Sequence, residues 1–404
     1  MDHAATSPLH PRAIEAVTRA LRDVYGNPSS QHAKGRAAKA LLEESRVAVA
    51  EAVGAYPDEI YFTSGGTESN NLAIMGACAA QARTCGPATV VTSALEHPSV
   101  TKTVRGLRRE GWNAVYLDAQ GGNLDLDALE HALADEDVRL VSIMSVQSEL
   151  GYRFPVPAVV RACRSAASAA ASAAGGSSQV ASWPLVHTDA VQAFGKLPLD
   201  AHALDVDLLS FCSHKVGGPK GIGALYVRRG TRLFTTAFGG GQERGLRSGT
   251  EALPLIAGFA EAARIASAGQ RAACARATRL RDRLVLALQA HYDGIVVNSR
   301  EDGSPFIVNF TLPGTDNRTV LERLSDAGVF LSASMACSSN HATVPPGTWR
   351  EKHPLALQLA GVPARFTRCT YRVSFSDRTT EADVDRFLYA FEEVVRLRLG
   401  RRSA

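Results

Sequence analysis

The sequence has little that would place the protein in a membrane, outside the cell or on nucleic acid. No apolar run in its 404 residues approaches the roughly 20 residues of a membrane-spanning helix. The seven cysteines form no CxxC pair and no regular framework, which favours a reducing compartment. The 44 basic residues are nearly balanced by 40 acidic ones. We therefore expect neither a nucleic acid nor a membrane among the partners.

The first residues lack the apolar stretch of a secretory signal and the long Arg- and Ser-rich stretch of a transit peptide. We expect a cytoplasmic protein, or an organellar one if a leader has been removed. The 45% hydrophobic and 21% charged residues are near globular averages, which excludes a wholly disordered or fibrous chain. This length predicts two domains of unequal size.

Short β-branched runs alternate with helical stretches through the first part of the chain. The alternation is typical of an α/β fold with a mainly parallel sheet and helices on both faces. Two helices are expected between residues 11 and 54, broken at 25–28. The strand-like runs that follow are 59–63, 89–92, 114–117, 138–144, 185–187, 208–211 and 223–227.

After Thr250 the sequence pattern changes. It predicts a long helix around 273–290, strand-like runs at 295–298 and 306–310, and a closing helix over 381–399. These elements predict a smaller α+β domain. We predict a large domain over 12–258, with a low-complexity Ala/Ser/Gly insertion at 165–182. The small domain would combine 1–11 with 259–404.

Three motifs follow predicted strands, where open α/β sheets bind their ligands. Lys215 enters a Gly-rich loop, where an ε-amine can become nucleophilic toward an aldehyde. Asp189 ends another strand, and a carboxylate there can keep a pyridine nitrogen protonated. Residues 62–71 form a Gly-Gly turn in which backbone amides and the Thr67 hydroxyl suit a phosphate. Each motif alone could be a surface lysine, a helix cap or a capped turn, but together they indicate a pyridoxal phosphate site.

With these motifs the chain resembles the class V aminotransferase family of fold-type I pyridoxal-phosphate enzymes, and within it the cysteine desulfurases and selenocysteine lyases. The resemblance implies a fold-type I transferase with a mainly parallel seven-stranded sheet, the cofactor pyridoxal 5′-phosphate and a homodimer. It also implies a role in iron–sulfur cluster or selenium metabolism. The matching stretches, in the family's order, are 2–6, 26–30, 63–71, 96–97, 187–192, 210–223, 239–244, 247–250, 336–337 and 372–374.

Carried over residue by residue, the resemblance implies the cofactor contacts. Lys215 would form the Schiff base, Asp189 would pair with the pyridine nitrogen, and Gln192 would reach the phenolic oxygen. His97 would stack on the ring and relay protons, although alone it would be interpreted as a cap before Pro98. The phosphate would be surrounded by Gly66, Thr67, Ser213 and His214, with Cys212 beside them and Thr250 from the neighbouring subunit.

On the substrate side, the resemblance implies that Arg372 clamps the substrate carboxylate, for which a bidentate guanidinium is suited. Ser148 would also bind the substrate, beside Arg372. Cys337 corresponds to the family's mobile loop cysteine, and its thiolate would take sulfur from the substrate as a persulfide. The six other cysteines are interpreted as buried side chains that pack in the apolar core. No metal is expected.

Three of the chain's departures from the family concern the candidate site and the segment after Cys337. Residues 147–149 read Gln-Ser-Glu where the family usually has Asn-Asn-Glu, Cys212 replaces a phosphate-binding serine, and the segment between Cys337 and Arg372 is longer. The leading hypothesis is a cysteine desulfurase that converts L-cysteine to L-alanine and an enzyme persulfide. The alternatives are a selenocysteine lyase acting on L-selenocysteine, another reaction of the family that needs no Cys337, such as transamination, and an inactive desulfurase-like scaffold. Both sulfur and selenium release imply an acceptor protein.

Overall fold

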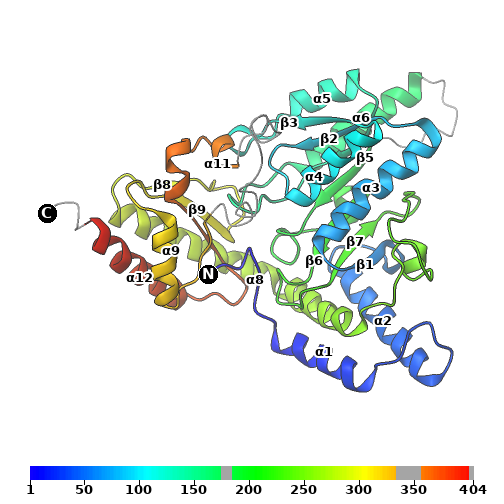
Figure 1. Cartoon of the computed structure of the whole chain (residues 1–404), viewed down its shortest axis with the longest axis horizontal. Helices are drawn as coiled ribbons and strands as arrows, with labels where there is room; N and C mark the ends of the chain where they lie inside the picture. The colour runs from blue at the N-terminus through cyan, green and yellow to red at the C-terminus, as the bar shows by residue number, and fades with distance from the viewer. Residues whose placement is uncertain (174–183, 334–355, 400–404) are drawn as a thin grey trace.

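A seven-stranded sheet organises most of the chain. The computed structural model describes residues 1–173, 184–333 and 356–399 (Figure 1). The strand order is β1-β7-β6-β5-β4-β2-β3, and all neighbours are parallel except β7, which is antiparallel to β1 and β6. The predicted, mainly parallel sheet is confirmed. Its strands are β1 (Ile60–Thr63), β2 (Thr89–Ser93), β3 (Asn113–Leu117), β4 (Val138–Ser142), β5 (Leu185–Asp189), β6 (Leu208–Cys212) and β7 (Gly223–Val227).

Helices cover both faces of this sheet, because consecutive strand residues are apolar on both sides. On β5, for example, Leu185 packs in the cluster that includes α3 and α4, whereas Val186 packs in the cluster that includes α2, α6 and α8 (Leu253–His291). The helices of this part are α1 (Pro11–Asp23), α2 (Ala33–Glu51), α3 (Gly66–Cys85), α4 (Pro98–Leu107), α5 (Leu126–Asp135), α6 (Val156–Ala173) and α7 (Ala201–Leu204).

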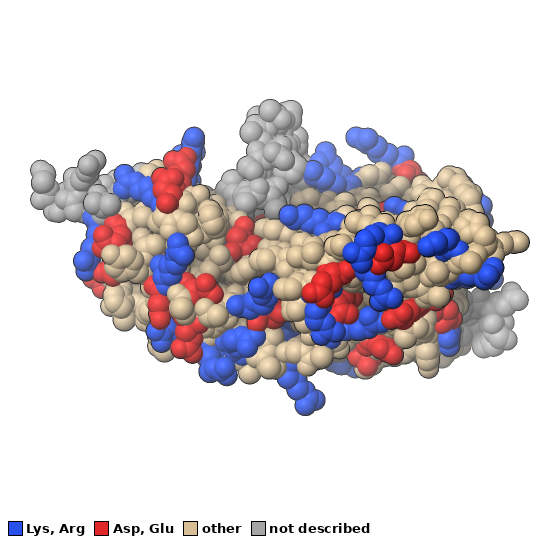
Figure 2. All heavy atoms as spheres, turned by 90° about the horizontal axis from the view of Figure 1, so that it is seen from below, with Lys and Arg blue, Asp and Glu red and all other residues tan. Residues whose placement is uncertain are grey.

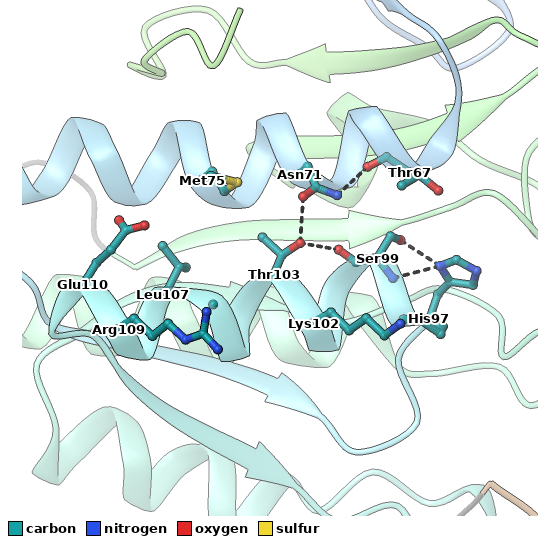
Figure 3. A pocket seen from close by; sticks show the side chains of 12 residues that line it. Thr67, Asn71, Met75, His97, Ser99, Lys102, Thr103, Leu107, Arg109 and Glu110 are labelled. Carbon is teal, nitrogen blue, oxygen red and sulfur yellow. Dashed lines mark hydrogen bonds between the residues drawn. The ribbon is translucent and has the colours of Figure 1, made fainter. Parts of the chain in front are cut away.

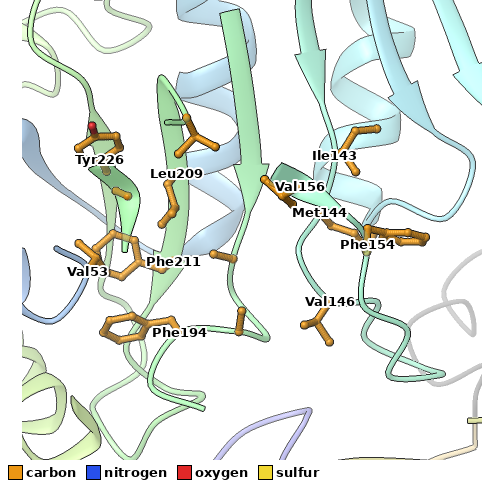
Figure 4. Close-up of a cluster of buried hydrophobic side chains, with 14 of the residues drawn as sticks. Val53, Ile143, Met144, Val146, Phe154, Val156, Phe194, Leu209, Phe211 and Tyr226 are labelled. Carbon is orange, nitrogen blue, oxygen red and sulfur yellow. The ribbon is translucent and has the colours of Figure 1, made fainter. Parts of the chain in front are cut away.

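The larger hydrophobic cluster includes Phe194 and Phe211, which lie close in sequence to the ends of β5 and β6 (Figure 4). Phe194 and Phe211 are fully buried, with ring centroids 4.7 Å apart, and both rings lie 5.9 Å from Phe259. Each buried aromatic side chain contributes about 1.5–3 kcal/mol. Phe194 follows Gln192 by two residues, and Phe211 directly precedes Cys212. This packing therefore fixes the two loops on which the predicted cofactor residues lie.

Helix α8 (Leu253–His291) connects the two parts of the chain and is longer than predicted, at 39 residues. Phe259, in its first half, packs in the larger core, whereas Leu284, in its second half, packs in a separate cluster with the small sheet. The expected start near 273 was wrong, because the sequence between Pro254 and 273 also favours a helix with its proline in the first turn. The domain division at residue 258 stays a prediction.

A small antiparallel sheet of order β10-β9-β8 forms the second part. Its strand β10 was not among the predicted strands. The elements are β8 (Val296–Val297), β9 (Ile307–Thr311), β10 (Thr370–Ser374), α9 (Asn317–Asp326), α11 (Ala356–Leu359) and α12 (Glu381–Leu399). The chain's first residues lie next to this sheet, where Asp2 forms a parallel bridge with Ser374 (Figure 1).

The face shown in Figure 2 carries charges of both signs. On the face shown in Figure 2, acidic and basic side chains alternate and no broad stripe of one sign forms. No helix within the described ranges is both long and apolar enough to cross a membrane.

Candidate active site

A cavity of about 250 Å³ lies at the carboxyl ends of β5 and β6, bordered by the N-terminal segment. It brings together most of the residues that the sequence predicted. Those that line it are Gly66, Thr67, His97, Ser148, Asp189, Gln192, Cys212, His214, Lys215 and Arg372.

Lys215 lies three residues beyond the end of β6. Its Nζ donates hydrogen bonds to the carbonyl oxygens of Ala4, at 2.5 Å, and Ala5, at 2.7 Å. The turn that follows is tight, with a φ of +81° at Gly217, where a glycine is favoured. The N-terminal segment and this turn therefore fix the amine at the cavity wall.

Asp189 is the last residue of β5 and is 7% exposed. Its Oδ2 accepts a hydrogen bond from Asn70 Nδ2 at 2.7 Å, and its Oδ1 accepts one from the Val191 amide at 2.9 Å. The capping interpretation and the functional one are thus compatible, since the same carboxylate holds the turn and lines the cavity. A carboxylate fixed in this way suits a protonated ring nitrogen.

A polar chain connects Asp189 to His97. Asn70 Nδ2 also donates to Ser99 Oγ at 2.8 Å, and that hydroxyl lies 2.7 Å from His97 Nδ1. His97 caps α4, because its Nδ1 accepts from the Ser99 amide at 3.1 Å, while its ring lines the cavity. Burial lowers the pKa of His97, an effect that Asp189 opposes and Lys215 assists. The imidazole is therefore neutral at neutral pH.

The N-terminus of α3 and the loop after β6 form the end of the site that suits a phosphate. Gly66 cannot be replaced without displacement, since a Cβ there would lie 2.6 Å from Val191 Cγ2. Ser213 is fully buried, and its Oγ has no hydrogen-bond partner among the described residues. This hydroxyl faces Gly218 and does not line the cavity. Burial and the neighbouring Lys215 lower the pKa of His214 to about 4, so this side chain is uncharged.

Cys212 lies beneath this end of the cavity. Burial raises the pKa of its thiol to about 11, despite the opposing effect of Lys215. The thiol therefore stays protonated and can donate only weakly. The adjacent Ser213 hydroxyl is fully buried and does not line the cavity, so its contact with a phosphate stays a prediction.

Gln192 faces the N-terminal segment. Its Nε2 donates to the Ala4 carbonyl at 3.0 Å, and its Oε1 accepts from Lys196 Nζ at 3.2 Å. The lysine therefore fixes which end of the amide lies toward the cavity. Burial lowers the pKa of Lys196 to about 7.

Arg372 enters the cavity from β10 and is 5% exposed. Its Nη1 donates to the backbone carbonyl of Ser148 at 3.1 Å, and its Nη2 lies 2.9 Å from Asp2 Oδ1. The contact with Ser148 is thus made by the main chain. The Nε of Arg372 is buried and has no partner among the described residues, so it is available to an acceptor.

A second hollow of about 670 Å³ lies between α3 and α4 and adjoins the cavity (Figure 3). Thr67, His97 and Ser99 line both spaces. Thr103 joins the two helices, since its hydroxyl bonds Asn71 Oδ1 at 2.9 Å and the Ser99 carbonyl at 2.7 Å. The site is therefore open to the surface along this groove.

Two predicted residues of the described part of the chain, Ser213 and Thr250, do not line the cavity. Thr250 is exposed and does not line it. Cys337 lies outside the described residues.

The structure also adds residues that the sequence did not single out. The matching stretches 2–6 and 63–71 contain Asp2, Ala4 and Asn70, but residue type alone gave them no role. Lys196 follows Gln192 by four residues, a spacing that could have indicated a contact.

The chain matches the family model described as aminotransferase class-V over residues 1–387. The chain belongs to this family. It is 38% identical over 407 residues to cysteine desulfurase IscS of Serratia proteamaculans (strain 568), covering 99% of this chain and 92% of the relative. The solved structure of a NifS-like protein matches with a TM-score of 0.86 and 32% identity, covering 98% of both chains. SspA in complex with cysteine matches with a TM-score of 0.75 and 29% identity, covering 94% of this chain and 99% of SspA.

Members of the class-V family depend on pyridoxal 5′-phosphate, and the cavity fits this cofactor. The backbone amides of Gly66 and Thr67, at the N-terminus of α3, would hold its phosphate. Asp189 would face its ring nitrogen and Lys215 its aldehyde. Within the described ranges, no three His, Cys, Asp or Glu side chains form a group that could hold a metal ion.

Proposed function

We propose that the protein is a cysteine desulfurase that converts L-cysteine to L-alanine and leaves the sulfur as a persulfide on Cys337. The observation that carries the proposal is the convergence of Lys215, Asp189 and Arg372 on one cavity. The names of the relatives support the same activity. A location in the cytoplasm, or in an organelle after removal of a leader, stays a prediction.

Some residues of the site stabilise charge, and others transfer protons. The bound cofactor would supply an electron sink that acidifies the α-carbon of the amino acid. Asp189 would stabilise the positive charge of the ring nitrogen, and Arg372 would bind the substrate carboxylate with its remaining donors. Lys215 accepts the α-proton, and the neutral His97 relays protons within the site.

Sulfur transfer then requires a thiolate. In the proposed step, Cys337 forms a bond to the substrate sulfur as the substrate's Cβ–S bond breaks. The electron pair of that bond passes to the carbon skeleton, which takes up a proton and leaves as L-alanine. The persulfide must be passed to an acceptor, for which we propose a second protein.

The first test is an absorbance scan of the purified protein, followed by assays of alanine and sulfide with L-cysteine and with L-selenocysteine. Bound cofactor and alanine formed from L-cysteine are expected. Activity confined to L-selenocysteine would favour the lyase alternative. A protein that binds no cofactor and forms no product would support the scaffold alternative.

Replacing Cys337 by serine should lower alanine formation from L-cysteine by about 10³-fold or more, because the sulfur acceptor is removed. Selenium release should be affected less, since a selenolate is the better leaving group. Cys274→Ser, on α8, is the matched control and should keep wild-type rates. Equal losses with both substrates would contradict the assigned role.

We also propose a homodimer in which Thr250 completes the phosphate site of the neighbouring subunit. Thr250 is exposed on its own chain, within a loop fixed to the large sheet. Glu243 of this loop forms a buried pair with Arg46, at 2.7 Å, and accepts from the Phe62 amide at 2.8 Å. A loop fixed in this way can present a hydroxyl to a partner at little entropic cost.

Thr250→Ala should therefore raise the dissociation constant of the cofactor by about threefold to tenfold, because one hydrogen bond is lost. Thr18→Ala, an exposed hydroxyl on α1, serves as the control. The measurement is cofactor absorbance after gel filtration at several protein concentrations. A monomer with full cofactor occupancy would contradict the shared site.

A further inference from the structure

The N-terminal segment lies along β10, the strand that carries Arg372. The Ser374 amide donates to the Met1 carbonyl at 2.9 Å, and the Ala4 amide donates to Ser374 Oγ at 2.8 Å. Asp2 forms a parallel bridge with Ser374. This pairing places the Asp2 carboxylate beside Arg372, although the two residues are 370 positions apart in the sequence.

Both oxygens of Asp2 are engaged. Oδ1 lies 2.9 Å from Arg372 Nη2, and Oδ2 accepts from Ser332 Oγ at 2.8 Å. The Ser332 carbonyl in turn accepts from the Arg372 amide at 2.9 Å. The Arg372 side chain is 6% exposed and that of Asp2 27%, so the pair is partly shielded from water. A shielded, doubly anchored pair is stronger than an exposed one.

Two contacts therefore fix the guanidinium plane. Asp2 holds Nη2, and the Ser148 carbonyl holds Nη1 at 3.1 Å. The buried Nε keeps no partner among the described residues. An unpartnered charged donor in a buried position is costly unless a ligand accepts from it. Because Asp2 uses only one oxygen on Arg372, N–H groups remain for a second acceptor.

We propose that Asp2 is a positioning residue for substrate binding. It orients Arg372 so that Nε and the remaining N–H groups receive the carboxylate of the amino acid, and it stays paired when the substrate arrives. The inference rests on the proposed function insofar as Arg372 binds an amino-acid carboxylate. It adds a part of the site that is supplied by the first residues of the chain.

The test is a double-mutant cycle in the holoenzyme with Asp2→Ala, Arg372→Ala and both together. One readout is the binding of L-alanine, followed by the change in cofactor absorbance; the other is KM and kcat with L-cysteine. Asp2→Ala should weaken L-alanine binding and raise KM by about tenfold, with kcat within about twofold. In the Arg372→Ala background, Asp2→Ala should change neither the dissociation constant of L-alanine nor the KM for L-cysteine.

Two further variants separate positioning from folding. Asp2→Asn keeps an acceptor for Nη2 without the charge, so its KM should lie between those of the wild type and Asp2→Ala. Asp23→Ala, an exposed acid on α1, is the control and should behave as the wild type. Cofactor absorbance and the urea midpoint, measured on every variant, show that the fold is intact.

Two results would overturn the proposal. If Asp2→Ala weakens binding equally in the Arg372→Ala background, Asp2 acts by holding Ala4 and Ala5 against Lys215. If Asp2→Ala tightens binding, Asp2 competes with the substrate for Arg372. A wild-type protein that binds L-alanine but forms no product from L-cysteine would refute the proposed function, whereas the L-alanine cycle would still decide the role of Asp2.

Discussion

Replacing Lys215 by alanine is expected to abolish the near-visible absorbance of bound cofactor and to lower alanine formation from L-cysteine by about 10⁴-fold or more. The amine would both hold the cofactor and carry the α-proton, so one substitution removes two functions. Lys196 is a second amine nearby, but its Nζ is buried and bonded to Gln192 Oε1, so it is poorly placed to substitute. The measurements are an absorbance scan and an alanine assay.

Two variants make the Lys215 experiment specific. Lys215→Arg keeps a cation that can donate to the Ala4 and Ala5 carbonyls, yet a guanidinium does not deprotonate in a protein and is a poor nucleophile. It should preserve the fold and lose the absorbance. Lys220→Ala, five residues further on, should keep both. An undiminished absorbance in Lys215→Ala would refute the assignment.

The parts of the site that local sequence could predict lie at strand ends. Asp189 and Lys215 each follow a short buried strand, and the order of parallel strands places such ends at one edge of the sheet. The sequence therefore predicted both the sheet and the neighbourhood of these two residues. Their contacts with the cofactor came only as implications of the resemblance.

The remaining contacts depend on distant pairings that no local pattern contains. Asp2 meets Arg372 because the first residues pair with β10, and β10 itself was not among the predicted strands. Asn70 bonds Asp189 across 119 positions of sequence. The start of α8 was misplaced for a different reason, because the helix-favouring sequence between Pro254 and 273 was not assigned to the helix. Long-range register, rather than residue type, decides the Asp2 and Asn70 contacts.

Asp189→Asn should lower alanine formation by about 10³-fold while the cofactor stays bound through Lys215, because a neutral amide cannot keep a pyridine nitrogen protonated. The substitution is nearly isosteric. The introduced side-chain amide would still accept from the Val191 amide through its oxygen, and Asn70 could turn its unpartnered Oδ1 toward the new NH₂ group. Loss of activity would therefore report on charge and not on a broken turn. The measurements are the alanine assay and the pH dependence of the cofactor absorbance.

The matched control for Asp189→Asn is Asp207→Asn, because Asp207 is also a buried carboxylate of the large sheet but lies away from the cavity. It pairs with Arg164 at 2.9 Å and accepts from the Val186 amide at 2.7 Å. Removing its charge should destabilise the protein, since Arg164 loses a partner, yet the activity per folded molecule should stay at the wild-type value. If both variants lose activity in proportion to stability, the Asp189 carboxylate has only a structural role. If Asp189→Asn alone loses activity while its urea midpoint is unchanged, the charge at the end of β5 is what the chemistry requires.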